Sequence, residues 1–178
     1  MTARSKLLTV KPEPGECAPY YRGYVDQVPE TDVIAILEDQ IALRAQLLAQ
    51  LSDEKARFRY ADGKWSIKEI VGHLSDAERI FAYRALRIAR GDATPLSGFE
   101  QDDYVAATNF DRRPFPELLD ELDTVRRASL SLFRSLTDDE LMRKGTASDN
   151  PFVARVIPFI IAGHEIHHIR ILRERYLS

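Results

Sequence analysis

The sequence is poor in cysteine, in excess positive charge and in long apolar runs. Its single cysteine, Cys17, excludes an internal disulfide, a CxxC redox pair and a thiolate-rich zinc site. The 25 Lys and Arg residues against 28 Asp and Glu give a net charge of −3, so no global positive field attracts nucleic acid or anionic lipid. No stretch approaches the roughly 20 apolar residues of a membrane span, and no export pattern is visible. We therefore expect a cytoplasmic protein that binds neither nucleic acid nor membranes.

The residues that are present suit an ordinary soluble domain. Hydrophobic residues make up 44% of the 178 positions, which is enough to bury a core without disulfides. Proline and glycine interrupt every periodic pattern in residues 1–30, so this part is expected to be an irregular lead-in. Residues 31–178 are expected to form one domain.

Four segments carry apolar residues at spacings of three and four, which predicts amphipathic helices. They cover roughly residues 32–51, 67–90, 116–136 and 159–176. Residues 91–114 are rich in turn-forming residues and predict a long ordered crossover with room for one helical turn. No segment shows sustained strand alternation, so the predicted fold is an all-α four-helix bundle with a long crossover connection.

The helix starts carry recognisable signals. Thr31 or Asp32 can cap the first helix, and Ser66 with Glu69 forms a capping box for the second. A second capping box begins at Thr137 and predicts a short helix that ends near Gly145. Pro158 either starts the last helix or kinks its first turn.

Three of the four histidines are predicted to point into the bundle. His164 and His168 stand one turn apart on the inward face of the last helix, and His73 lies on the buried stripe of residues 67–90. Imidazoles in this arrangement can converge on one metal ion, whereas the alternative is a set of hydrogen-bonded core histidines. His167 points about 100° away from His168, and its role is left open.

The segment from His164 to His168 also spells H-E-x-x-H, the pattern of zinc proteases, in which the glutamate is the general base. Only ten residues follow His168, and Ile171 and Glu174 stand where the metzincin extension needs glycine and histidine. A protease is therefore not expected. Glu165 is the candidate catalytic residue if hydrolysis occurs, although its side chain lies about 100° from that of His164.

Other polar side chains of residues 67–90 have expected structural roles. Glu69 serves the capping box, and Asp76 and Glu78 are expected to be solvated charges. The arginines of this helix form a solvated face, or one of them binds a substrate carboxylate. They are Arg79, Arg84, Arg87 and Arg90.

Aromatic residues are expected to pack around the bundle. Trp65 packs at the entrance of the second helix and three tyrosines cover core edges, or either set roofs a pocket. The tyrosines are Tyr20, Tyr21 and Tyr24. Ile166 and Ile169 lie on the far side of the last helix from His164 and need another neighbour, for which a homodimer contact is one answer.

Two blocks of the sequence resemble the DinB-like proteins, in particular the group of YfiT-type metal-dependent hydrolases and low-molecular-weight thiol transferases. The blocks are Gly63 to Arg79, which contains W-S-x-x-E-x-x-x-H, and Ile161 to His168. The resemblance extends over residues 24–172. It implies a four-helix bundle with a three-histidine metal site formed by His73, His164 and His168, in which water or substrate fills the open positions.

Two classes of function follow. The first is a metal-dependent enzyme in which Zn²⁺ or Ni²⁺ activates water or a low-molecular-weight thiol towards a small-molecule substrate, as a hydrolase or a thiol transferase. The second is a non-catalytic stress-response binding module with a structural metal. Open coordination positions would favour the enzyme, and a fourth protein ligand would favour the module.

Overall fold

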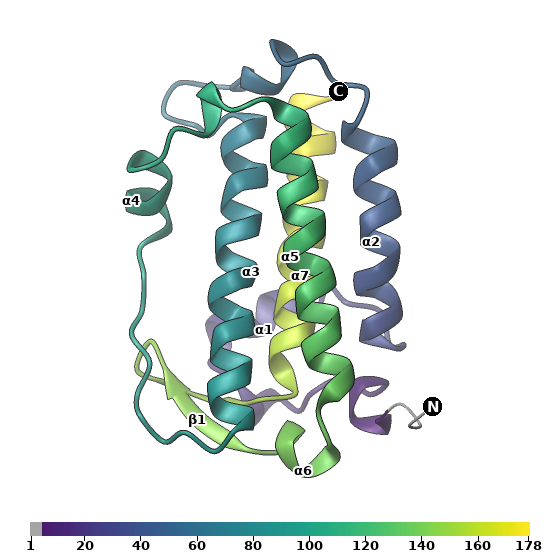
Figure 1. Ribbon diagram of the computed structural model, residues 1–178, viewed down its shortest axis with the longest axis vertical. Coiled ribbons are helices and arrows are strands. Elements are labelled where there is room, and N and C mark those ends of the chain that lie inside the picture. The colour runs from purple at the N-terminus through teal and green to yellow at the C-terminus, as the bar shows by residue number, and fades with distance from the viewer. Residues whose placement is uncertain (1–4) are drawn as a thin grey trace.

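Four long helices make up the body of the computed structural model, which describes residues 5–178 (Figure 1). They are α2 (Val33–Leu48), α3 (Ile67–Ala89), α5 (Phe115–Ser135) and α7 (Val156–Ile171). A π-helical turn, Leu172–Tyr176, continues α7. The prediction of an all-α four-helix bundle is confirmed, and each predicted helix lies within a few residues of an observed one.

The order of helix directions explains the long crossover. In Figure 1, α2 and α7 run in one direction, whereas α3 and α5 run in the other. Because α3 and α5 are parallel, the chain between them must return along the whole length of the bundle. This return contains the short helix α4 (Gln101–Ala106), in the segment where one helical turn was predicted.

The local signals act as expected at the helix starts. Ser66 and Glu69 form the capping box of α3, and the side chain of Asp32 accepts from the amide of Ile34 at 2.9 Å. Thr137 caps α6 (Asp138–Leu141). Pro158 is the third residue of α7, in the first turn, where an amide has no intrahelical acceptor to lose.

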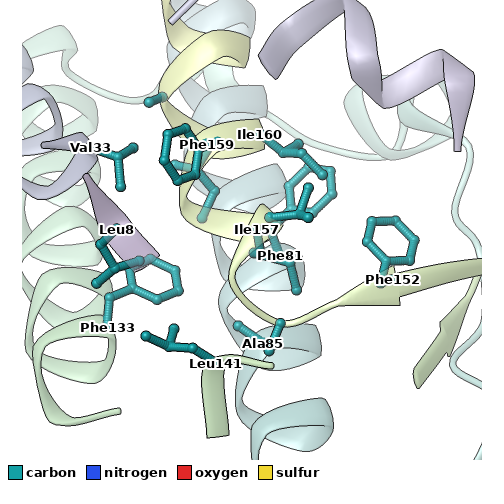
Figure 2. Packing of buried hydrophobic residues seen from close by; sticks show 14 of the residues in the cluster. Leu8, Val33, Phe81, Ala85, Phe133, Leu141, Phe152, Ile157, Phe159 and Ile160 are labelled. Atoms are coloured by element: carbon teal, nitrogen blue, oxygen red, sulfur yellow. The ribbon is translucent and has the colours of Figure 1, made fainter. Parts of the chain in front are cut away.

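The largest group of buried side chains fills the end of the bundle where α7 begins (Figure 2). Phe133 of α5 and Phe159 of α7 are fully buried there. A second group fills the other end and includes Phe115, Leu122 and Leu172. Among the described residues, no helix combines the length and the hydropathy that a membrane crossing requires.

The structure differs from prediction in the segment before α2. Pro19–Val25 forms a helix, α1, and does not belong to an irregular lead-in. Pro19 occupies the first helical position, which tolerates its missing amide hydrogen, and α1 packs on α7.

The prediction that no strand forms is also wrong. After α6 the chain forms an antiparallel hairpin of β1 (Lys144–Ala147) and β2 (Asn150–Val153), where a helix was predicted to continue to Gly145. Ser148 and Asp149 have φ angles of 49° and 59°, as a tight two-residue hairpin turn requires. Leu96 of the crossover exchanges backbone hydrogen bonds with Thr146 and Ser148, so the crossover lies along the hairpin.

Candidate metal centre

The structure brings His73, His164 and His168 together between α3 and α7. The Nε2 atom of His164 lies 3.0 Å from that of His73 and 3.1 Å from that of His168. Each residue offers one ligand atom, and these atoms all lie within 4.8 Å of one another. Tetrahedral ligands about 2.0–2.1 Å from zinc are separated by roughly 3.3 Å, so three nitrogens at these distances have the spacing of a metal site.

Two glycines allow other segments to approach the histidines closely. A Cβ atom at Gly72 would lie 2.5 Å from the ring of Phe110, and one at Gly163 would lie 2.0 Å from the carbonyl oxygen of Tyr24. Glycine at position 163 therefore lets α1 lie directly on α7. As a result, the ring of Tyr24 packs edge-on against His164, with 5.2 Å between centroids.

Burial keeps the three imidazoles neutral. It lowers the pKa of His73 from its ordinary value of 6.5 to about 4. Burial, followed by the charges of neighbouring histidines, holds the pKa values of His164 and His168 well below 6.5. Because only a neutral imidazole has a free lone pair for a metal, these side chains are in the ligand form at neutral pH.

A pocket of about 390 Å³ opens beside His73 and His164. Its walls come from α3, from the crossover, from the hairpin turn at Ser148 and from α1. The α1 side chains are Tyr20, Tyr21 and Tyr24, so the tyrosines border a pocket, the second of the two roles expected for them. No local sequence signal pointed to Ser148, because it reaches the pocket only through the hairpin.

Trp65 lies at the entrance of α3, in the place predicted for it. Its ring centroid is 4.7 Å from that of His73 and 6.5 Å from that of His168, and it is nearly parallel to the His168 ring. The Nδ1 atom of His168 is buried without a hydrogen-bond partner among the described residues. Glu69 caps α3, as expected, and also pairs with Arg59.

Glu165 does not join the histidines. Its Oε1 atom accepts a hydrogen bond from Arg44 and its Oε2 atom accepts one from Arg126, each at 2.6 Å, in the interior of the bundle. Both carboxylate oxygens are therefore occupied by guanidinium donors inside the bundle. The structure gives Glu165 two ion-pair partners, and the general-base role considered from the sequence stays a prediction.

The ion pairs of Glu165 belong to a network that joins all four long helices. Arg126 of α5 also binds Glu78 of α3 through both carboxylate oxygens, and it donates to Leu37 and Gln40 of α2. Burial opposes the charge of Arg126, but the carboxylates of Glu165 and Glu78 raise its pKa above the ordinary value. The expectation that Glu78 is a solvated charge is wrong, since its side chain is only 3% exposed.

His167 lies outside the histidine group, as its helical angle indicated. It is partly exposed, its ring contacts Tyr24, and its Nδ1 atom lies 3.4 Å from Arg170. Ile169 packs within the second core group of its own chain. Ile166 and Ile169 border a groove between α2 and α7, and the homodimer contact stays a prediction.

Comparison with known sequences places most of the chain in one family. A sequence profile described as the DinB superfamily matches residues 36–172. A protein of Oceanobacillus iheyensis named "Putative metal-dependent hydrolase" is 26% identical over 159 residues, which cover 80% of this chain and 87% of the relative. A protein of the same name from Geobacillus thermodenitrificans is 27% identical over 150 residues, covering 80% and 83%.

Comparison with solved structures identifies the same architecture. YfiT from Bacillus subtilis, described as a probable metal-dependent hydrolase with an unusual four-helix bundle topology, superposes with a TM-score of 0.67. The superposition covers 95% of this chain and 97% of the other, at 16% sequence identity. At this identity the likeness establishes the fold.

Proposed function

This chain belongs to the DinB superfamily, and on that premise we propose that it is a divalent-metal-dependent hydrolase of small molecules. Its metal ligands would be His73, His164 and His168. The observation that supports this proposal best is the convergence of their three Nε2 atoms beside an open pocket. The names of the sequence relatives support the reaction class.

The donor set fits a transition metal. Three neutral imidazoles suit Zn²⁺ and Ni²⁺, and three protein ligands leave coordination positions for water or substrate. A divalent cation in this place supplies the charge that lowers the pKa of a water molecule or thiol towards neutrality. No carboxylate or cysteine among residues 5–178 completes a fourth protein position in this group, which favours an enzyme over a structural site.

The chain's own residues then bind and orient the substrate. Phe81, Phe99 and the tyrosines of α1 give the pocket aromatic side chains against which an apolar part of a substrate can pack. Tyr24 holds the His164 ring from the side by an edge-on contact. The two carboxylate oxygens of Glu165 accept hydrogen bonds from Arg44 and Arg126, so the proposed reaction does not use Glu165 as a base.

The proposal is tested first by metal content and then by turnover. The untagged chain, purified without chelator, is expected to hold about one divalent ion per molecule by elemental analysis. Metal-loaded protein is then screened against small esters, amides and other electrophiles, with and without low-molecular-weight thiols. Turnover without thiol supports the hydrolase.

The other outcomes assign other functions. Turnover that requires the thiol would make the protein a thiol transferase and overturn hydrolysis. Absence of turnover, together with a metal whose coordination positions are all filled by protein, would support a binding module with a structural metal.

A further inference from the structure

Arg84 of α3 is a buried cation without a carboxylate partner among the described residues. Its side chain belongs to a residue only 1% exposed. The Nη2 atom donates to the carbonyl of Ser97 at 2.9 Å and to the hydroxyl of Ser148 at 2.8 Å, whereas the Nη1 atom is buried and has no partner. The other buried arginines, Arg44, Arg126 and Arg155, each pair with at least one carboxylate.

An unpaired buried guanidinium calls for an explanation. Burying a charge without a counter-charge destabilises the fold, and leaving one of its donors unsatisfied adds to that cost. The bonds to Ser97 and Ser148 attach the crossover to the hairpin, but both acceptors are uncharged and a neutral side chain could make similar bonds. Among the described residues the guanidinium charge meets the rings of Phe81 and Phe99, but no carboxylate neutralises it.

The position of Arg84 relates it to the metal site. His73, Ala77, Phe81 and Arg84 follow one another at spacings of four, four and three, so they form one stripe along α3. The first three line the pocket beside the histidines. Arg84 lies eleven residues after His73, which is about three helical turns, or roughly 16 Å along the axis of α3. Helical side chains lean back towards the N-terminus, which for Arg84 is the direction of His73.

A second pocket lies at the end of this stripe where Arg84 stands. It has a volume of about 390 Å³, is lined by Arg84, and shares Gly98 and Phe99 with the pocket beside the histidines. The Cζ atom of Arg84 lies 5.6 Å from the ring centroid of Phe81 and 6.0 Å from that of Phe99. The cation therefore stands at the boundary of the two pockets, near two aromatic residues that also line the pocket beside the histidines.

We propose that Arg84 binds the carboxylate of the substrate, so that this enzyme acts on organic acids with an apolar or aromatic body. The proposal rests on the function proposed above, because the reacting end of the same molecule must reach the histidines. One unpaired nitrogen matches one carboxylate oxygen better than it matches a phosphate, which needs several donors. Glu100 and Asp102 are exposed at the first pocket and disfavour a second negative group on the substrate there.

The test compares an acid with its neutral analogue on the full untagged chain. By calorimetry, 3-phenylpropionate is expected to bind at least about tenfold more tightly than 3-phenylpropionamide, because a hydrogen bond to a charged group is the stronger one. Arg84→Gln should remove this difference, and Arg84→Lys should keep part of it. Arg79→Gln is the matched control, since Arg79 lies on the same helix but is exposed and paired with Glu121.

Two further measurements separate this proposal from the metal site and from misfolding. His168→Ala should keep the preference for the acid. Loss of the preference in that variant would assign the carboxylate to the histidines and overturn the role of Arg84. In the wild-type chain with ¹⁵N-labelled arginine, the acid but not the amide should shift the Arg84 side-chain resonance, which requires no destabilised variant for the comparison. Equal binding of acid and amide, or stronger binding of inorganic phosphate, would also overturn the proposal.

Discussion

The Nη2 atom of Arg126 donates a hydrogen bond of 2.6 Å to the Oε2 atom of Glu165. In the sequence, Glu165 directly follows His164 of the candidate metal centre. Arg44 of α2 donates a hydrogen bond to the other carboxylate oxygen of Glu165. His164 lines the pocket beside α1, whereas both carboxylate oxygens of Glu165 are held in the ion-pair network of the bundle. Substitutions at these two positions should have different consequences.

Replacing Glu165 by Gln should reduce stability and leave the metal site in place. Removing one partner of a buried ion pair leaves uncompensated charge, and we expect the free energy of unfolding to fall by roughly 3–5 kcal/mol. Urea unfolding measures this loss, and elemental analysis should still find one ion per chain. Glu174→Gln, which removes an exposed pair with Arg170, is the control and should change stability by less than about 1 kcal/mol. A stable Glu165→Gln protein that binds metal but has lost turnover would make Glu165 a catalytic base.

Replacing any one of His73, His164 and His168 by Ala should weaken metal binding sharply, because each offers one of the three ligand atoms of the proposed site. Trp65 is the single tryptophan and its ring lies 4.7 Å from that of His73, so quenching of its fluorescence by added Ni²⁺ reports binding at this site. His167→Ala is the matched control on the same helix and should retain the wild-type titration curve. A His73→Ala protein with unchanged affinity would remove that residue from the ligand set.

The metal-free protein should lose stability as the pH falls below 6.5. Burial lowers the pKa of His73 from its ordinary value of 6.5 to about 4 in the folded chain. Between pH 6.5 and pH 4, the imidazole of His73 is therefore protonated in the unfolded chain but stays neutral in the folded chain. The free energy of unfolding should therefore decrease by up to about 1.4 kcal/mol per pH unit for this group. The measurement is urea unfolding from pH 7 to pH 4.5, and His73→Gln should show a shallower slope. Parallel curves for the two proteins would contradict the low pKa.

Gly163→Ala should displace α1. The added Cβ atom would meet the carbonyl oxygen of Tyr24 at 2.0 Å, which neither backbone can accommodate without a shift. We expect the melting temperature to fall and proteolysis within residues 19–25 to accelerate, as limited trypsin digestion at Arg22 would show. Gly23→Ala is the control, since nothing lies within 4 Å of a Cβ atom at that position. Unchanged digestion in Gly163→Ala would show that α1 does not depend on this contact.

The helical periodicity was sufficient to predict the bundle and the faces of its histidines. His73 and His164 lie 91 positions apart, yet each stood on an apolar stripe that had to face the core. The capping residues Ser66 and Thr137 fixed two helix starts for a purely local reason, since a side-chain oxygen and a backbone amide three residues on make the bond.

Features that depend on contacts distant in sequence were not predictable in this way. Periodicity assigns charged residues to the surface, so it could not reveal that Arg44, Glu78 and Arg126 are buried in one ion-pair network with Glu165. The strands β1 and β2 have only four residues each, too few for an alternating pattern. Helix α1 contains Gly23 and is stabilised by packing on α7, which its own sequence does not indicate.

The pocket beside the histidines has two kinds of wall, which differ in how many sequence changes they tolerate. His73 and His164 stand on long helices whose other faces form the core, so their positions are tied to the stability of the whole molecule. The opposite wall comes from α1, from the crossover near Phe99 and from the hairpin turn at Ser148, all outside the four long helices. Insertions and exchanges in such connecting segments are tolerated far better than changes in a packed core. In the proposed enzyme, the segments that select the substrate can therefore diversify while the three histidines keep their positions.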